Sequence, residues 1–148
     1  MSRPLILETS QIARNAAGQV YSALTDYAAH EARAREAGAE VTRLGDGNRW
    51  HARFRLRGIP REIELTILEA VADTSLRVHV VSPNLDIVSH TRLVPIGPGR
   101  TEVVLRVEVG PRSLAARLML QSARLAQARL ARRMGRRLRR FLKTIPAG

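Results

Sequence analysis

Apolar and polar residues alternate between residues 50 and 67, and this period of two predicts a pair of β-strands. Every second residue from 50 to 56 is apolar, while the residues between them are His or Arg. Residues 63–67 repeat the alternation after a turn at Gly58-Ile59-Pro60. A strand with one apolar face is typical of a half-buried sheet. If the two strands form a hairpin, Glu62 and Glu64 lie opposite the preceding arginines on the solvent face.

Three further extended segments follow, at residues 76–81, 85–94 and 101–109. Ser82-Pro83-Asn84 and Gly97-Pro98-Gly99 separate them, and both are strong turn signals. In the last segment the odd-numbered positions from 103 to 109 are apolar and the even ones are mostly charged. The pattern predicts an antiparallel meander with one covered face. Residues 5–12 are also expected to be extended.

Two short helices are expected between the first strand and the meander. Asn15 is a suitable cap for a helix that runs through Leu24. A second helix is predicted over 27–37, where Ala, Glu and Arg dominate and Gly38 offers a stop. Asp26, between the two, is interpreted as a helix-end residue rather than a catalytic base.

The period lengthens to that of a helix after residue 111, and one long C-terminal helix is predicted as the cover of the sheet. Gly135 is the weak point in this prediction, because glycine is a poor helix former. On a helical wheel the apolar residues form one stripe and the arginines occupy the rest. The stripe consists of Ala116, Met119, Leu120, Ala123, Leu130, Met134, Leu138, Phe141 and Ile145.

The order of strand, two short helices, antiparallel meander and long C-terminal helix is the helix-grip layout. The segment Val-Tyr-Ser-Ala-Leu-Thr-Asp-Tyr at 20–27 resembles the first-helix signature of the START-type lipid-transfer, polyketide cyclase and coenzyme Q-binding superfamily, SRPBCC. The resemblance implies a single α+β domain over residues 1–148. In it, a curved antiparallel sheet of about six to seven strands surrounds the C-terminal helix and leaves a cavity between them.

Strand parity then predicts the lining of that cavity, which is almost entirely apolar. Ser89 and Thr91 are the exceptions, since two hydroxyls on the apolar face can hydrogen-bond one oxygen of a ligand, a backbone group or a water. The alternative is that the apolar side chains simply fill the space. The predicted ligand-cavity residues are Trp50, Phe54, Leu56, Leu65, Val78, Val80, Ile87, Ser89, Thr91, Val103, Leu105, Val107, Met119, Leu120 and Ala123.

Charge is concentrated in the C-terminal segment. The chain carries 25 Lys and Arg against 13 Asp and Glu, a net charge of +12, yet no acidic residue follows Glu108. Surface helices normally mix both signs, so this segment is expected to contact a polyanion. The alternative is a solvated face in a chain that uses arginine in place of lysine. The predicted polyanion-binding residues are Arg117, Arg124, Arg129, Arg132, Arg133, Arg136, Arg137, Arg139, Arg140 and Lys143.

Two polyanions fit this segment, an anionic membrane surface and an RNA or ribosome. Leu114, Leu118 and Leu125 lie opposite the core stripe, where they can dip into a bilayer or pack in a homodimer. Stacking aromatics are not interleaved with the arginines, which limits an RNA contact to the phosphates. The resemblance to ribosome-association toxins keeps the RNA alternative open.

No motif for catalysis or cofactor binding is found. The chain has no cysteine, no Gly-rich phosphate loop and no paired-carboxylate motif, and its four histidines lack metal-ligand spacing. We expect His51, His79 and His90 on the solvent face and no metal or cofactor. The resemblance leaves a polyketide cyclase-like enzyme as an alternative, although the expected cavity offers no group for proton transfer.

The sequence therefore predicts a non-enzymatic protein that binds or transports a hydrophobic small molecule, lipid or quinone-like, and docks on an acidic surface through its Arg-rich helix. Glu8 interrupts the N-terminal apolar run too early for a signal peptide, so a cytoplasmic location is expected. The identity of the ligand and the oligomeric state are not encoded in any motif we find.

Overall fold

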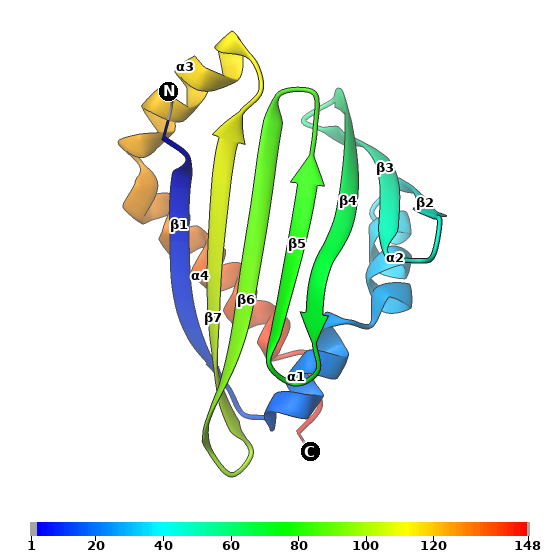
Figure 1. Ribbon diagram of the computed structural model, residues 1–148, viewed down its shortest axis with the longest axis vertical. Helices are drawn as coiled ribbons and strands as arrows, with labels where there is room; N and C mark the ends of the chain where they lie inside the picture. Colours follow the sequence, from blue (N-terminus) through cyan, green and yellow to red (C-terminus); the bar gives the residue numbers. More distant parts are fainter. Residues whose placement is uncertain (1–2, 148) are drawn as a thin grey trace.

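The computed structural model describes residues 3–147, which form a seven-stranded antiparallel sheet with four helices (Figure 1). Met1, Ser2 and Gly148, the outermost residues of the expected single domain, lie outside the described residues. The strand order is β1-β7-β6-β5-β4-β3-β2, so the first strand pairs with the last. The strands are β1 (Leu5–Ala13), β2 (Glu40–Leu44), β3 (Arg49–Leu56), β4 (Ile59–Val71), β5 (Ser75–Val81), β6 (Leu85–Gly97) and β7 (Arg100–Pro111).

All six strands expected from the sequence are present, and the helix-grip fold class is confirmed. In the hairpin of β3 and β4, Glu62 lies opposite Arg53, as expected, and their side chains are 4.0 Å apart. Glu64 was also expected opposite an arginine, but it lies opposite His51 and accepts from Arg49 at 3.3 Å. Each of these exposed pairs contributes at most about 1 kcal/mol.

The short edge strand β2 was not predicted. Its sequence, Glu-Val-Thr-Arg-Leu, has apolar residues only at Val41 and Leu44, and most of its side chains are exposed. An edge strand needs no second buried neighbour, so its apolar pattern is weak. The glycines of the connection to β3, Gly45 and Gly47, have positive φ angles of 58° and 87°, as a tight turn requires.

The first short helix, α1 (Ala17–Leu24), begins differently from the prediction. Asn15 does not cap it, because the N-cap position is Ala16. The Asn15 side chain is instead buried and donates to the carbonyl of Pro146 at 2.7 Å. Its own carbonyl accepts from the Thr101 hydroxyl at 2.8 Å. Asn15 therefore joins the start of α1 to β7 and to the C-terminal end of the described chain.

The second short helix, α2 (Tyr27–Glu36), agrees with the prediction at both ends. Asp26 is its N-cap and accepts from the backbone N–H of Ala29 at 3.2 Å. The chain leaves the helix through Gly38, whose φ of 97° is unfavourable for any residue with a side chain. Asp26 is thus a helix-end residue, as expected.

The C-terminal segment forms two helices, α3 (Leu114–Arg124) and α4 (Gln127–Leu142), where one continuous helix was expected. At the break the N–H groups of Leu125 and Ala126 bond to carbonyls only three residues earlier. The Gln127 side chain then donates to the carbonyl of Ile6 at 2.6 Å, and Arg124 donates to that of Arg3. Contacts with β1 and the residues before it therefore fix the break.

Both helices cover the same face of the sheet, which we call the inner face. Leu138 and Leu142 of α4 pack on residues of β6 and β7 that point inward, Leu93 and Val103. Val20 of α1 completes this core and is fully buried. On α3, Ala116 and Leu120 are only 4% exposed. Figure 1 shows α4 crossing behind the sheet, with α3 at one end and α1 at the other.

Helix α4 approaches the sheet closely at Gly135, and this glycine is not a weak point in the helix. A Cβ atom placed on it would lie 2.6 Å from Thr9 Oγ1 and 2.9 Å from Gln11 Nε2, both on β1. Carbon and polar atoms do not approach so closely without displacement. The absence of a side chain at Gly135 therefore lets α4 lie directly on the sheet.

We predict that Gly135→Ala destabilises the protein by about 1–3 kcal/mol, because overpacking outweighs the roughly 1 kcal/mol gained in helix propensity. Chemical denaturation of both proteins measures the difference. The control is the same Gly135→Ala change made in a Thr9→Ala variant, which lacks the hydroxyl nearest the added methyl. An equal loss of unfolding free energy with and without Thr9→Ala would contradict the close-approach explanation.

Candidate functional site

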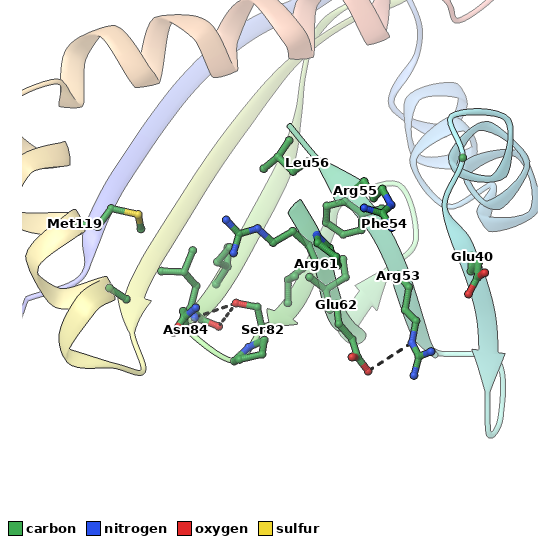
Figure 2. Close-up of a pocket in the computed structure, with 18 of the residues that line it drawn as sticks. Glu40, Arg53, Phe54, Arg55, Leu56, Arg61, Glu62, Ser82, Asn84 and Met119 are labelled. Atoms are coloured by element: carbon green, nitrogen blue, oxygen red, sulfur yellow. Dashed lines mark hydrogen bonds and ion pairs between the residues drawn. The ribbon is translucent and has the colours of Figure 1, made fainter. Parts of the chain in front are cut away.

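A pocket of about 1270 Å³ lies between the inner face of β3–β6 and helix α3 (Figure 2). Its floor comes from adjacent strands, and α3 and the chain between α2 and β2 contribute to its walls. The lining is mixed. Its apolar residues come from the inner face and α3, and its polar residues come from β2, the β3–β4 hairpin and the β5–β6 turn. The apolar group includes Phe54, Leu56, Ile63, Val80, Ile87 and Met119, and the polar group Glu40, Arg53, Arg55, Arg61, Glu62, Ser82 and Asn84.

The pocket brings together five of the residues that the sequence analysis assigned to a cavity, four from strand parity and one from the C-terminal helix. They are Phe54, Leu56, Val80, Ile87 and Met119. Met119 is 51% exposed although it belongs to the predicted core stripe of the helix. Its side chain lines the pocket, and Figure 2 shows it extending from α3 toward that space. Whether these residues bind a ligand stays a prediction.

The other ten predicted cavity residues do not line this pocket. Val103 is fully buried in the core beneath α4, and Leu105 packs against that core. Thr91 is also buried, at 8% exposure, and Ser89 is half-buried. The space under the C-terminal helices is therefore filled at the α4 end and open at the α3 end. The remaining residues outside the lining are Trp50, Leu65, Val78, Val107, Leu120 and Ala123.

Arg61 is a pocket residue that the sequence analysis missed. It pairs with Phe54 in the β3–β4 register, so both side chains lie on the inner face. Figure 2 shows it reaching into the pocket from β4. Arg53 lies near Glu62, and Arg55 donates to the carbonyl of Gly58 at 3.2 Å. Within residues 3–147 Arg61 makes no ion pair. The alternation rule that placed Ile63 on the inner face also applies to Arg61 and could have identified it as a pocket residue.

A cluster around Trp50 holds α2 against β2 and β3, beside the pocket. The indole Nε1 of Trp50 donates to Glu31 at 2.8 Å, and Arg43 donates to both oxygens of that carboxylate at 2.8 and 2.9 Å. The Tyr27 ring meets Trp50 edge-on at 5.1 Å. Trp50 is only 7% exposed, so it positions the pocket wall instead of lining the pocket.

The hydrogen bonds from Arg43 and then from Trp50 lower the pKa of Glu31, and they outweigh the opposite effect of desolvation. The carboxylate is therefore ionised at neutral pH and links the helix to two strands. Because α2 is followed directly by Ala37, Gly38 and Glu40 of the pocket lining, this ionic contact sets the position of one pocket wall.

The outer side of the C-terminal helices carries the charge expected from the sequence. Of the ten predicted polyanion-binding residues, Arg117 on α3 is exposed and Arg124 bonds to the Arg3 carbonyl. The other eight predicted residues are exposed and belong to α4 or directly follow it: Arg129, Arg132, Arg133, Arg136, Arg137, Arg139, Arg140 and Lys143.

Within residues 3–147 no helix is long and apolar enough to cross a membrane.

The fold and its pocket define a helix-grip protein, in which helices cover a concave antiparallel sheet and leave a pocket beside them. Residues 5–145 match the model of one such family, described as polyketide cyclase / dehydrase and lipid transport. The chain therefore belongs to this family, and the resemblance seen in the sequence is confirmed. A comparison with curated proteins finds no significant match.

Solved structures share the fold at low sequence identity. A START superfamily protein from Mycobacterium smegmatis has a TM-score of 0.67 at 12% identity and covers 95% of this chain and 99% of its own. An aromatase/cyclase from a Streptomyces species has 0.63 at 15%, with coverage of 95% and 92%. A conserved protein from Geobacillus kaustophilus has 0.68 at 15%, with 95% of both chains. At these identities the likeness shows the fold alone.

We predict that the contribution of Glu31 to stability depends on pH. A carboxyl with a lowered pKa in the folded state stabilises the protein above its unfolded pKa of about 4.3, and this stabilisation is lost as the pH falls through the folded pKa. Glu31→Gln should therefore cost stability at pH 7 and progressively less below about pH 4. Urea denaturation between pH 3 and 7 measures this, with Glu36→Gln, on the exposed end of α2, as control. A loss of stability in Glu31→Gln that is the same at every pH would contradict the lowered pKa of Glu31.

Proposed function

We propose that this protein binds or transports a hydrophobic small molecule, lipid or quinone-like, in the pocket beside α3, and docks through its Arg-rich helix on an acidic surface. The observation that carries the proposal is the open pocket of about 1270 Å³ with an apolar floor. Ligand sites commonly enclose about 300–1,000 Å³, so the space suits a large apolar molecule. Membership of a family described partly by lipid transport supports the same function.

The polar end of the pocket suggests how such a ligand is oriented. Arg61 offers several N–H donors at one edge of an otherwise apolar floor formed by residues such as Val80 and Ile87. A ligand with an acidic or carbonyl oxygen at one end can bond to Arg61 while its apolar part lies along the strands. Guanidinium groups bond carboxylates and phosphates in a fixed, bidentate geometry.

Binding is favoured over catalysis by the state of the acidic side chains at the pocket. The lining carboxylates, Glu40 and Glu62, are both exposed. Glu62 is contacted by Arg53 and also by His51. General acid–base catalysis usually needs a titratable group held in a sheltered position next to the substrate. These carboxylates have no such shelter, and we therefore propose a binding protein without enzymatic activity.

We predict that Met119→Trp weakens the binding of a fluorescent fatty-acyl probe by at least about tenfold. The larger ring would occupy the pocket while leaving the buried face of α3 unchanged, since Met119 is half exposed. Gln121→Trp is the matched control, because it adds the same ring to an exposed position of α3 outside the pocket lining. Titration of delipidated protein with the probe measures both, and absence of any probe binding to the unchanged protein rejects the proposed function.

We also predict that Arg61 distinguishes ligands by their polar end. Arg61→Leu should reduce affinity for a long-chain fatty acid by about fivefold, as expected for one partly exposed charge pair worth about 1 kcal/mol. The affinity of the Arg61→Leu variant for the corresponding long-chain alcohol should change less. Competition with the bound probe gives both affinities. Arg92→Leu, on an exposed position of β6 away from the pocket, controls for the loss of charge, and equal effects of the two variants would contradict the role of Arg61.

A further inference from the structure

We propose that the outer surface of α3 and α4 docks on a bilayer that contains anionic lipids. The exposed leucines of α3 and its C-cap enter the boundary between headgroups and acyl chains, and the arginines of α4 contact the headgroups. This inference rests on the proposed function in one respect, because docking would bring the pocket to the membrane that holds its ligand. The partner surface itself is argued from the two helices alone.

Both helices present their outer sides in the same general direction, away from the sheet. Leu138 and Leu142 bury one side of α4 on the inner face, and Ala116 and Leu120 bury one side of α3. The residues on the opposite side of each helix must therefore point away from that face. The leucines of α3 and the arginines of α4 thus share one side of the molecule, although they belong to different helices.

The apolar part of this surface is unusually exposed. Leu114, Leu118 and Leu125 are 70%, 57% and 93% exposed, respectively. Spacings of four and seven residues place them along one line of the helix surface. Burying a leucine side chain is worth about 1.5–3 kcal/mol, so three leucines left in water are a large unused source of binding energy. A bilayer can recover this energy without any specific pocket.

The cationic part covers the whole outer side of α4. It consists of seven arginines of α4 and the adjacent Lys143, all exposed, and within residues 3–147 none of these eight side chains makes an ion pair. The helix has 16 residues and is therefore about 24 Å long. Each Lys or Arg near an anionic bilayer contributes about 1 kcal/mol of attraction, and a flat surface is accessible to many of them at once.

A bilayer matches both parts of the surface, whereas a nucleic acid matches only the charge. RNA phosphates would satisfy the arginines but would leave the leucines in water. The aromatic side chains that stack on unpaired bases are missing from this surface, since Phe141 packs against the core and stacks near His30. Helices that combine exposed leucines with a dense basic side are typical of proteins that lie in the membrane interface.

The pocket adjoins the leucines on the same helix. Ala115 and Met119 of α3 line it, and each directly follows one of the exposed leucines, Leu114 and Leu118. The pocket lies between the sheet, which forms its floor, and α3, which contributes to its wall (Figure 2). Docking through α3 would therefore bring the pocket within a helix diameter, roughly 10 Å, of the membrane interface.

Co-flotation with vesicles tests the proposal, using phosphatidylcholine alone and phosphatidylcholine with 30% phosphatidylglycerol at about 150 mM salt. The protein should float with the anionic vesicles and not with the neutral ones. The variant Arg132→Gln, Arg136→Gln, Arg140→Gln should bind anionic vesicles about 100-fold less tightly. The control removes the same charge from exposed arginines outside the two helices, Arg14→Gln, Arg92→Gln, Arg100→Gln, and should change binding less than threefold.

The leucines separate a bilayer from other polyanions. Leu118→Gln with Leu125→Gln should weaken vesicle binding by at least about tenfold while leaving retention on a heparin column unchanged, because the charge is preserved. Vesicle binding that is insensitive to the leucine changes would overturn the proposed insertion. Co-sedimentation with ribosomes at about 150 mM salt, together with no flotation on anionic vesicles, would overturn the bilayer in favour of RNA.

Probe uptake from a vesicle-free solution separates this inference from the proposed function. If the protein floats with anionic vesicles but takes up no fatty-acyl probe, docking stands and the ligand-binding function fails. If it takes up the probe but does not float, docking fails and ligand binding stands. The leucine variant should take up the probe from solution as well as the unchanged protein, because neither leucine lines the pocket.

Discussion

The close packing of α4 on β1 is the contact on which the rest of the structure depends. Gly135 allows it, because the inward-facing side chains of Thr9 and Gln11 occupy the space that a Cβ would need. With the helix axis this near to the sheet, Leu138 and Leu142 reach the buried side chains of β6 and β7 and fill that end of the fold. A helix held farther away would leave a void there, and voids in a core cost stability.

The break between α3 and α4 separates the part of the inner face that forms a filled core from the part that forms the pocket floor. The bonds of Gln127 to Ile6 and of Arg124 to Arg3 fix the chain at the break, and α3 then packs mainly on β7. Helix α3 therefore covers part of the inner face and leaves the strands from β3 to β6 open next to Met119. The same sheet face thus serves as a core beneath one helix and as a pocket floor beside the other.

Strand parity predicted the faces of the sheet well, because alternation is a property of each strand by itself. It placed Val80 and Val103 on one face, but it could not show that a helix buries Val103 and leaves Val80 in a pocket. The same rule applied to Arg61 would have placed it inward, had charged residues been considered. No glycine or proline marks the break at Leu125 and Ala126 in the sequence. Hydrogen bonds to backbone carbonyls far away in the chain stabilise the break, so no local pattern predicts it.

The charge of α4 is not explained by the needs of the fold. Five pairs of like charges lie four residues apart between Arg129 and Lys143, and each such pair costs an isolated helix roughly 0.2–0.5 kcal/mol. Only the cations at the C-terminal end of α4, Arg139, Arg140 and the C-cap Lys143, are favoured by the helix dipole. Leu138 and Leu142 would hold α4 in place equally well with mixed charges on its outer side. A feature that opposes helix formation and contributes nothing to packing is best accounted for by a polyanionic partner outside the molecule.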